Sequence, residues 1–279
     1  MAEPALRRRL RDMLLETTGI KIPDSKTPMM ESRLRRRITH CGASGLDDYL
    51  AYVFQGGGLS EEWPHVVDAM TTNKTDFFRE PAHFDMMAHR VLPEALAGTR
   101  PGTHRRFRLW SAAASTGAEA YSLAMLLAEA ALAAPQLDWA ILGTDISPSV
   151  LAKARRAIYP VAELAPVSPP RRARFVMSGT CPDGQASGRI VPELRRRVRF
   201  AELNLMEMPY PVDTELDAIF LRNVLIYFTP DTQAAVIAAL VPHLRQGGYL
   251  FVGHAESMVV DHPELVQLAP AAFVKRRRN

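Results

Sequence analysis

Residues 108–121 read Arg-Leu-Trp-Ser-Ala-Ala-Ala-Ser-Thr-Gly-Ala-Glu-Ala-Tyr, and this stretch decides the fold. A short apolar segment is followed by a run of small residues and then by helix-forming residues, which is the order of a strand, a tight loop and a helix. Such a loop leaves free backbone N–H groups at the helix start and lets a ligand approach the backbone closely. We therefore predict that a nucleoside cofactor binds at this loop.

The composition is that of a globular protein with one large domain or two modest ones. The chain has 279 residues, of which 47% are hydrophobic and 23% charged. No run approaches the roughly 18 uninterrupted apolar residues of a membrane span, and no apolar leader segment follows the basic N-terminus. Cys41 and Cys181 lie far apart, without the spacing of a metal site. We expect a cytoplasmic protein with reduced thiols, no membrane insertion and no bound metal.

From residue 107 onward, apolar strands alternate with helices, which predicts an α/β domain with a parallel sheet. Strands are expected near residues 107–110, 139–144, 217–221, 249–253 and 272–275. Residues 171–201 break this alternation, because short strand-like segments there flank a turn-rich loop at 179–188. We expect an inserted antiparallel β subdomain over 171–201, with strand-like residues 198–200 as its last strand.

Residues 1–70 read as a small all-α domain of short helices, which precedes the α/β domain of residues 71–279. The second helix, expected over about 28–39, has an apolar stripe and a basic face. The stripe consists of Met30, Leu34 and Ile38, and the basic face of Arg33, Arg36 and Arg37.

Positive charge is clustered along the chain, although the formal net charge is only +4. The main clusters lie within residues 7–11, 33–37, 105–108, 195–199 and 275–278. Clusters of this kind attract anionic partners, either a nucleic acid or an acidic protein surface. A solvated helix face or tail is the alternative interpretation of each cluster.

Polar side chains follow the predicted strands, where ligands bind in open α/β sheets. Asp145 ends the second strand, about 28 residues after Gly117, and its carboxylate can accept hydrogen bonds from both ribose hydroxyls. The alternative is that Asp145 caps the next helix or forms a turn. Arg222, Asn223 and the loop at His254 also follow strands.

The loop at Gly117 contains one glycine and lacks the three-glycine pattern that holds a pyrophosphate. We therefore favour a cofactor without phosphate, such as S-adenosylmethionine, over NAD. Glu119 either binds the amino-acid end of that cofactor or completes a capping box with Thr116. Similarly, Asn73 or Thr75 either contacts a ligand or caps a helix that follows.

Several motifs occur together in a fixed order along the chain. They span Thr72–Arg79, Leu109–Ser122, Thr144–Ser147, Leu203–Leu205, Leu221–Phe228 and Gly247–Ser257. In this order they resemble the chemotaxis receptor glutamate methyltransferases of the CheR type, over essentially the whole chain. The resemblance implies a Rossmann-like S-adenosylmethionine-dependent methyltransferase sheet with a small antiparallel β subdomain insertion, preceded by an all-α N-terminal domain.

The resemblance also implies the activity, which is O-methylation of glutamate side chains on the cytoplasmic helical bundle of chemoreceptors. The products would be glutamate methyl esters and S-adenosylhomocysteine. Residues implied to line the cofactor site are Asn73, Thr75, Arg79, Glu119, Asp145, Asn204, Leu205, Arg222 and Asn223. The chain departs from the family at Lys74, where a glutamate is common, and at Ala118 and Ala120, where Glu-Glu-Pro is common for residues 118–120.

Two surfaces are expected to dock the receptor, namely the basic helix at about 28–39 and the β subdomain at 171–201. Some family members use the subdomain to hold a peptide at the receptor C-terminus. The 179–188 loop reads as longer than in those members, so we expect independence from this tethering peptide.

A glutamate carboxylate is ionised near neutral pH, because its ordinary pKa is about 4.3, and it needs no general base. We expect Arg79 or Tyr227 to orient the incoming carboxylate, and His254 to have a structural role in its loop. One alternative function is methylation of nucleic acid, but Arg222-Asn-Val-Leu stands where an Asn/Asp-Pro-Pro-aromatic motif would follow the Asp217 strand, so no nucleic-acid partner is expected. A non-catalytic, cofactor-sensing module is a second alternative.

Overall fold

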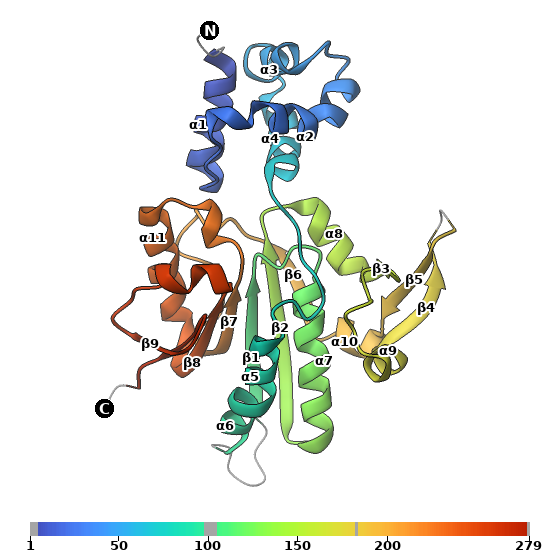
Figure 1. The fold of residues 1–279 in the computed structure, drawn as a ribbon, viewed down its shortest axis with the longest axis vertical. Helices are drawn as coiled ribbons and strands as arrows, with labels where there is room; N and C mark the ends of the chain where they lie inside the picture. The colour runs from blue at the N-terminus through green and yellow to red at the C-terminus, as the bar shows by residue number, and fades with distance from the viewer. Residues whose placement is uncertain (1–4, 98–104, 182–183, 278–279) are drawn as a thin grey trace.

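A helical domain lies over one end of an α/β domain, as the computed structural model shows for residues 5–97, 105–181 and 184–277 (Figure 1). The helical domain contains α1 (Ala5–Thr18), α2 (Thr27–His40), α3 (Leu46–Gln55) and α4 (Leu59–Met70). The predicted apolar stripe of α2 is confirmed, because Met30, Leu34 and Ile38 are buried in the core of this domain.

The predicted basic face of α2 is only partly directed to solvent. Arg37 donates to both carboxylate oxygens of Glu62, and its Nε lies 3.0 Å from Glu62 Oε2. Arg33 also bonds within the protein, to residues at the end of α4 and beyond it. Arg33 and Arg37 thus lie off the apolar stripe as predicted but are half-buried and bonded within the protein, whereas Arg35 and Arg36 are exposed.

Glu62 is buried under this ion pair, and the Tyr49 hydroxyl donates to its Oε2 at 2.8 Å. Hydrogen bonding to Arg37, reinforced by the Tyr49 bond, lowers the pKa of the Glu62 carboxyl from 4.5 to about 2. A depressed carboxyl pKa stabilises the fold above the ordinary pKa, and this stability is lost as the pH falls through the folded value. A shift of this size corresponds to up to about 3 kcal/mol.

We expect Glu62→Gln to lower the free energy of unfolding by about 2–3 kcal/mol at pH 7. The difference from the wild type should shrink by about 1 kcal/mol at pH 4, because the wild type begins to lose its contribution there. Urea unfolding followed by circular dichroism measures both values. Glu61→Gln, at the exposed neighbouring position, is the control and should change little. A Glu62→Gln deficit that stays constant down to pH 4 would contradict this account.

The α/β domain is built on one seven-stranded sheet in the order β6-β2-β1-β7-β8-β10-β9. Its strands are β1 (Arg105–Ala112), β2 (Leu137–Asp145), β6 (Val198–Glu202), β7 (Leu216–Leu221), β8 (Leu244–Val252), β9 (Leu265–Ala269) and β10 (Ala272–Lys275). Strands β6, β2, β1, β7 and β8 are parallel, and β10 is antiparallel to both of its neighbours. The predicted parallel sheet is confirmed.

Successive side chains of the central strands point to opposite faces of this sheet. In β1, Leu109 joins one core cluster and Trp110 the other, and Phe220 and Ile219 of β7 divide in the same way. Helices α5 (Pro81–Met86), α6 (Leu92–Ala97) and α7 (Ala118–Ala133) pack in the first cluster, and α11 (Pro230–Leu240) packs in the second. With both faces covered, β7 is buried along its whole length.

The chain passes from β1 to β2 and β6 on one side, and then returns to β7 on the other side of β1. This reversal opens a crevice beyond the carboxyl ends of β1 and β7, which is where open α/β sheets bind their ligands. The predicted loop after β1 therefore stands at the switch point.

The small antiparallel sheet has the order β3-β5-β4 and lies beside the main sheet (Figure 1). Its strands are β3 (Ile158–Pro160), β4 (Val176–Thr180) and β5 (Ala186–Ile190), with α9 (Pro169–Phe175) and α10 (Pro192–Arg195) next to them in the chain. The structure differs from the expectation for 171–201 in two strands, because β3 lies before that range and pairs with β5 in the small sheet, whereas β6 pairs with β2 in the main sheet. The expected 179–188 loop is also shorter, since Thr180 pairs with Ala186 and only residues 181–185 connect the strands.

None of the helices in the described ranges combines the length and the apolar character that crossing a membrane requires.

Candidate cofactor site

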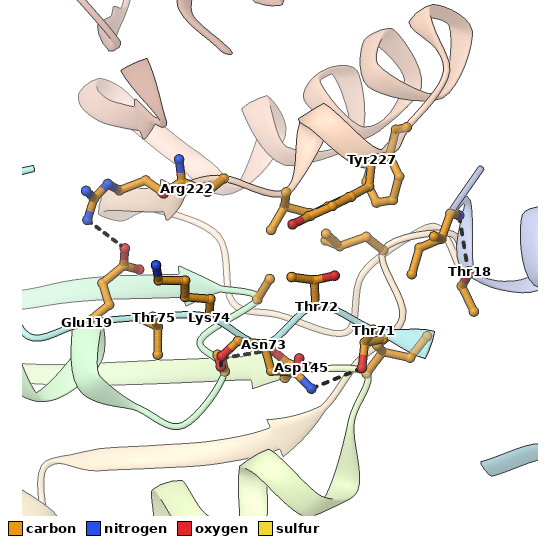
Figure 2. Close-up of a pocket in the computed structure, with 18 of the residues that line it drawn as sticks. Thr18, Thr71, Thr72, Asn73, Lys74, Thr75, Glu119, Asp145, Arg222 and Tyr227 are labelled. Atoms are coloured by element: carbon orange, nitrogen blue, oxygen red, sulfur yellow. Dashed lines mark hydrogen bonds and ion pairs between the residues drawn. The ribbon is translucent and has the colours of Figure 1, made fainter. Parts of the chain in front are cut away.

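A cavity lies between the carboxyl ends of the parallel strands and the helical domain. All ten side chains predicted for the site line it, namely Asn73, Thr75, Arg79, Glu119, Asp145, Asn204, Leu205, Arg222, Asn223 and Tyr227. Figure 2 shows the Tyr227 ring above the segment Thr71–Thr75, with Arg222 and Glu119 at one end of the cavity and Thr18 at the other. The helical domain thus supplies part of the wall, which the sequence did not indicate.

The segment between α4 and α5 forms one wall of the cavity. Residues 71–80 contain no helix, so Asn73 and Thr75 do not cap one. The Arg33 side chain donates to the Met70 carbonyl at 2.6 Å and to Thr72 Oγ1 at 2.9 Å, and it holds the start of this segment. Arg33, which belongs to the basic face of α2 expected to dock the receptor, therefore holds part of the cavity wall.

The loop after β1 approaches the same segment. Ser115 Oγ donates to the Asn73 carbonyl at 2.8 Å, which joins the two walls. Gly117 begins α7 with φ of 85°, and a Cβ there would lie only 3.0 Å from both Ala154 Cβ and Phe200 Cζ. Only glycine suits this position, so the single glycine of the loop provides the turn that directs α7 away from the cavity.

Asp145 ends β2 at the edge of the cavity and is 5% exposed. Its Oδ2 accepts from the Ser115 N–H at 2.8 Å, and its Oδ1 accepts from the Ser147 N–H at 3.0 Å. Burial raises the pKa of the Asp145 carboxyl, and these N–H bonds oppose that rise. The N-cap of α8 (Pro148–Arg156) is Ser147, so the alternative that Asp145 caps this helix is wrong, whereas its bond from the Ser147 N–H two residues on is the turn that the same alternative allowed. The carboxylate is fixed by two loops and retains acceptor capacity for ribose hydroxyls.

A buried chain of three charges closes the end of the cavity. Arg222, whose side chain is 2% exposed, places Nη1 3.0 Å from Glu119 Oε2 and Nη2 3.0 Å from Glu80 Oε2. Glu119 also accepts from Ser111 Oγ at 2.7 Å. The capping alternative for Glu119 is wrong, because α7 has no side-chain cap. One arginine between two carboxylates leaves a net negative charge, which favours a cationic ligand group.

Glu80 was not among the predicted site residues, although it follows Arg79 directly. It stands in the left-handed region with φ of 56°, immediately before α5. Burial alone would raise the pKa of the Glu80 carboxyl, but its bonds to Arg222 and Asn223 together hold that pKa below the ordinary value. Nothing in the local sequence distinguishes this glutamate from a solvated one, because its partners Arg222 and Asn223 come from the loop after β7.

Glu256, also not predicted, holds the loop that follows β7. Its side chain accepts from the backbone N–H groups of Asn223 at 2.8 Å, Gly253 at 2.6 Å and Ile226 at 3.3 Å, and the residue is 1% exposed. Asn223 has φ of 60°, a conformation that needs such support. Glu256 therefore fixes the backbone from which Arg222, Asn223 and Tyr227 reach the cavity.

His254 does not line the cavity, in keeping with the structural role expected for it. Its ring stacks on His83 with 5.1 Å between centroids, and both Nδ1 atoms lie 3.5 Å from Glu80 Oε2. Burial and the nearby Arg222 charge lower the pKa of His83 to about 4, so this ring is neutral near pH 7. Glu80, His83 and His254 have the spacing of metal ligands, but Arg222 already pairs with the carboxylate, so we assign no metal to them.

The seven-stranded sheet, the single-glycine loop at its switch point and the fixed Asp145 carboxylate in the cavity define a Rossmann-like methyltransferase that uses a nucleoside cofactor. Residues 73–274 match the SAM-binding domain of CheR methyltransferases, and residues 7–71 match the all-alpha domain of the same enzymes. The chain belongs to the CheR methyltransferase family.

Relatives of known name support this assignment over most of the chain. The chemotaxis protein methyltransferase of Salmonella typhimurium is 40% identical over 252 residues, which cover 90% of this chain and 83% of that relative. Chemotaxis protein methyltransferase 2 of Pseudomonas aeruginosa is 39% identical over 250 residues, covering 90% of this chain and 85% of that relative. The chemotaxis protein methyltransferase of Escherichia coli is 40% identical over 250 residues, which cover 90% of this chain and 83% of that relative.

The cofactor is S-adenosylmethionine, as the match to the SAM-binding domain shows. The residues present suit this cofactor. Asp145 is fixed at a strand end with acceptors available for ribose hydroxyls. The ion-pair network of Glu80, Arg222 and Glu119 has a net negative charge, which attracts a cationic group of the cofactor. The individual contacts of the ten lining side chains stay predictions.

Proposed function

We propose that this methyltransferase O-methylates glutamate side chains on the cytoplasmic domain of a chemoreceptor, giving glutamate methyl esters and S-adenosylhomocysteine. The chemistry of the cavity wall supports this proposal best. Arg79 and Lys74 bring positive charge to the wall, while Asp145 and Glu119 are held by backbone N–H groups and by Arg222. Among the residues that the structure describes, no histidine lines the cavity. This wall suits an acceptor that is already anionic and needs no proton removed, which describes a carboxylate better than an amine or a hydroxyl.

The names of the relatives give the acceptor its biological setting, because they are methyltransferases of chemotaxis. A glutamate on a receptor has an ordinary pKa of about 4.3 and is ionised near pH 7. In the proposed reaction one carboxylate oxygen forms a bond to the methyl carbon while the bond from that carbon to sulfur breaks, and no proton moves. The bound cofactor supplies the methyl group.

The work of the protein is then mainly positioning, which can contribute roughly 7–11 kcal/mol to a bimolecular reaction. We assign Arg79 and Tyr227 the task of orienting the incoming carboxylate. The Arg79 side chain is itself oriented, because Nη1 donates to the Lys74 carbonyl at 3.1 Å.

Docking involves charge as well. Arg35 and Arg36 are the exposed arginines of α2 and suit an acidic receptor helix, and the small antiparallel sheet is the second proposed docking surface. Methylation removes one negative charge per site, which relieves repulsion between carboxylates on the receptor bundle. This assignment places the protein in the cytoplasm, without nucleic-acid partners.

Independence from a receptor tethering peptide stays a prediction. The connection between β4 and β5 is residues 181–185, of which 182–183 lie outside the described residues. This connection is shorter than the loop expected from the sequence, so its length does not favour independence from the tethering peptide. Titration with a receptor C-terminal peptide decides the question, and micromolar binding would contradict independence.

Incubation with methyl-labelled S-adenosylmethionine and a receptor cytoplasmic fragment tests the proposed function. We expect nearly all of the transferred label to leave as volatile methanol after base treatment, because carboxyl methyl esters are base-labile. The matched control is the same fragment with its surface glutamates replaced by glutamine, which should not be labelled. Base-stable label on RNA or DNA would favour the nucleic-acid alternative, and cofactor binding without transfer would favour a sensing module.

A further inference from the structure

A second cleft, of about 650 Å³, lies between the C-terminal end of α8, α10 and the start of β6. It is lined by Tyr121, Arg155, Pro192, Arg195, Arg196, Val198, Arg199 and Phe200. None of these residues lines the cofactor cavity. Four arginines therefore meet at a place that the proposed methyl transfer does not use.

The charge of this cleft is not neutralised by carboxylates. No acidic residue lines it, and among the residues that the structure describes no carboxylate forms an ion pair with any of the four arginines. Arg155 Nη2 donates to the Phe200 carbonyl at 3.1 Å, and Arg195 Nε donates to the Ile190 carbonyl at 3.0 Å. These bonds orient the two side chains but leave their charges available.

The neighbouring Arg197 behaves differently, although it belongs to the same basic run in the sequence. Its guanidinium pairs with Asp138 and donates to the Trp139 carbonyl at 3.1 Å. The run at 195–199 thus divides into one arginine with a carboxylate partner and three that border the cleft. Among the described residues, the arginines of this run that border the cleft are thus the ones without a carboxylate partner.

The floor of the cleft is aromatic and fixed in place. Phe200 is half-buried, and its ring lies 5.7 Å from that of Tyr121. On the inner side the ring packs so closely that a Cβ at Gly143 would lie 2.6 Å from Phe200 Cε1. A ligand would therefore meet a rigid apolar floor under a rim of guanidinium groups.

We propose that this cleft binds a small phosphorylated ligand with two or more phosphate groups, such as a nucleoside diphosphate. The planar guanidinium fork matches phosphate geometry in bidentate fashion, and four such groups suit more than one phosphate. The volume is on the scale of small-ligand pockets. An acidic protein segment is the other occupant that this charge would attract, and competition with a glutamate-rich peptide distinguishes the two.

Isothermal titration with pyrophosphate and with ADP tests the proposal, in the presence of saturating S-adenosylhomocysteine so that adenosine cannot enter the cofactor cavity. Wild-type protein should bind at about 0.1 M salt. The double variant Arg196→Gln/Arg199→Gln should bind at least about tenfold more weakly. Arg35→Gln/Arg36→Gln is the matched control, because it removes the same charge from exposed positions on α2, and it should bind like the wild type. Circular dichroism verifies that both variants are folded.

Equal affinity for pyrophosphate and ADP would support recognition through phosphate alone, and tighter binding of ADP would also assign the nucleoside to the aromatic floor. Three results would overturn the proposal: no binding of either probe up to about 1 mM, an equal loss in the cleft variant and the α2 control, or displacement of the probes by a glutamate-rich peptide of equal charge that binds more tightly. None of these results depends on whether the enzyme methylates a receptor.

Discussion

Asp145→Asn is expected to weaken binding of S-adenosylmethionine and S-adenosylhomocysteine by about 100-fold, because hydrogen bonds to a charged acceptor contribute about 1.5–3 kcal/mol each. The carboxylate in its present place accepts from Ser115 N–H on one oxygen and from Ser147 N–H on the other. An asparagine would turn its amide donors toward one of these N–H groups. The variant therefore loses the acceptors proposed for the ribose and also disturbs the loop that carries Ser115.

Titration calorimetry with S-adenosylhomocysteine measures this loss, and a thermal melt shows whether the variant is folded. Asp68→Asn is a matched control, because Asp68 Oδ1 accepts from the hydroxyls of Ser147 and Ser149, outside the cavity, and an asparagine oxygen can do the same. We expect its affinity to stay within about twofold of the wild type. Unchanged affinity in a folded Asp145→Asn protein would show that the carboxylate does not hold the ribose.

The framework of this site could be predicted from sequence because it depends on local patterns. Apolar runs separated by helices indicated the parallel strands, and ligand-binding side chains are expected where such strands end. That reasoning brought Asp145 and Arg222 to one cavity, although they lie 77 residues apart. The resemblance to a known family added Asn204 and Leu205, which no periodicity would have selected.

The polar network around the site could not be predicted, because its partners are set by tertiary structure. Glu80 and Glu256 look like ordinary surface glutamates in the sequence, yet one pairs with Arg222 and the other accepts from three backbone N–H groups. Helical periodicity placed Arg33 and Arg37 on the polar face of α2, but it does not reveal which part of that face other segments cover. Strand pairing is similarly non-local, so β6 was expected in the small sheet and lies in the large one.

Arg222→Met is expected to lower the free energy of unfolding by about 3–5 kcal/mol near pH 7, because removal of one partner from a buried ion pair leaves an uncompensated charge. Here it would leave two, since Glu80 and Glu119 both pair with this guanidinium and have side chains only 16% and 11% exposed. Arg171→Met is the control: Arg171 pairs with Glu129 at 2.9 Å, but both side chains are about one-third exposed, so the cost should be about 1 kcal/mol or less.

The pH dependence of the Arg222→Met deficit separates this explanation from a simple loss of packing. Without the guanidinium, burial would raise the pKa of Glu80 above its unfolded value, so the variant should regain stability relative to the wild type as the pH falls from 7 toward 5. Glu80→Gln/Glu119→Gln in the Arg222→Met background should recover much of the stability at pH 7 for the same reason. It should not recover S-adenosylhomocysteine affinity, because the net negative charge of the site is gone. A deficit that is independent of pH, and that the glutamine substitutions do not reduce, would mean that Arg222 acts through its packing and not through its charge.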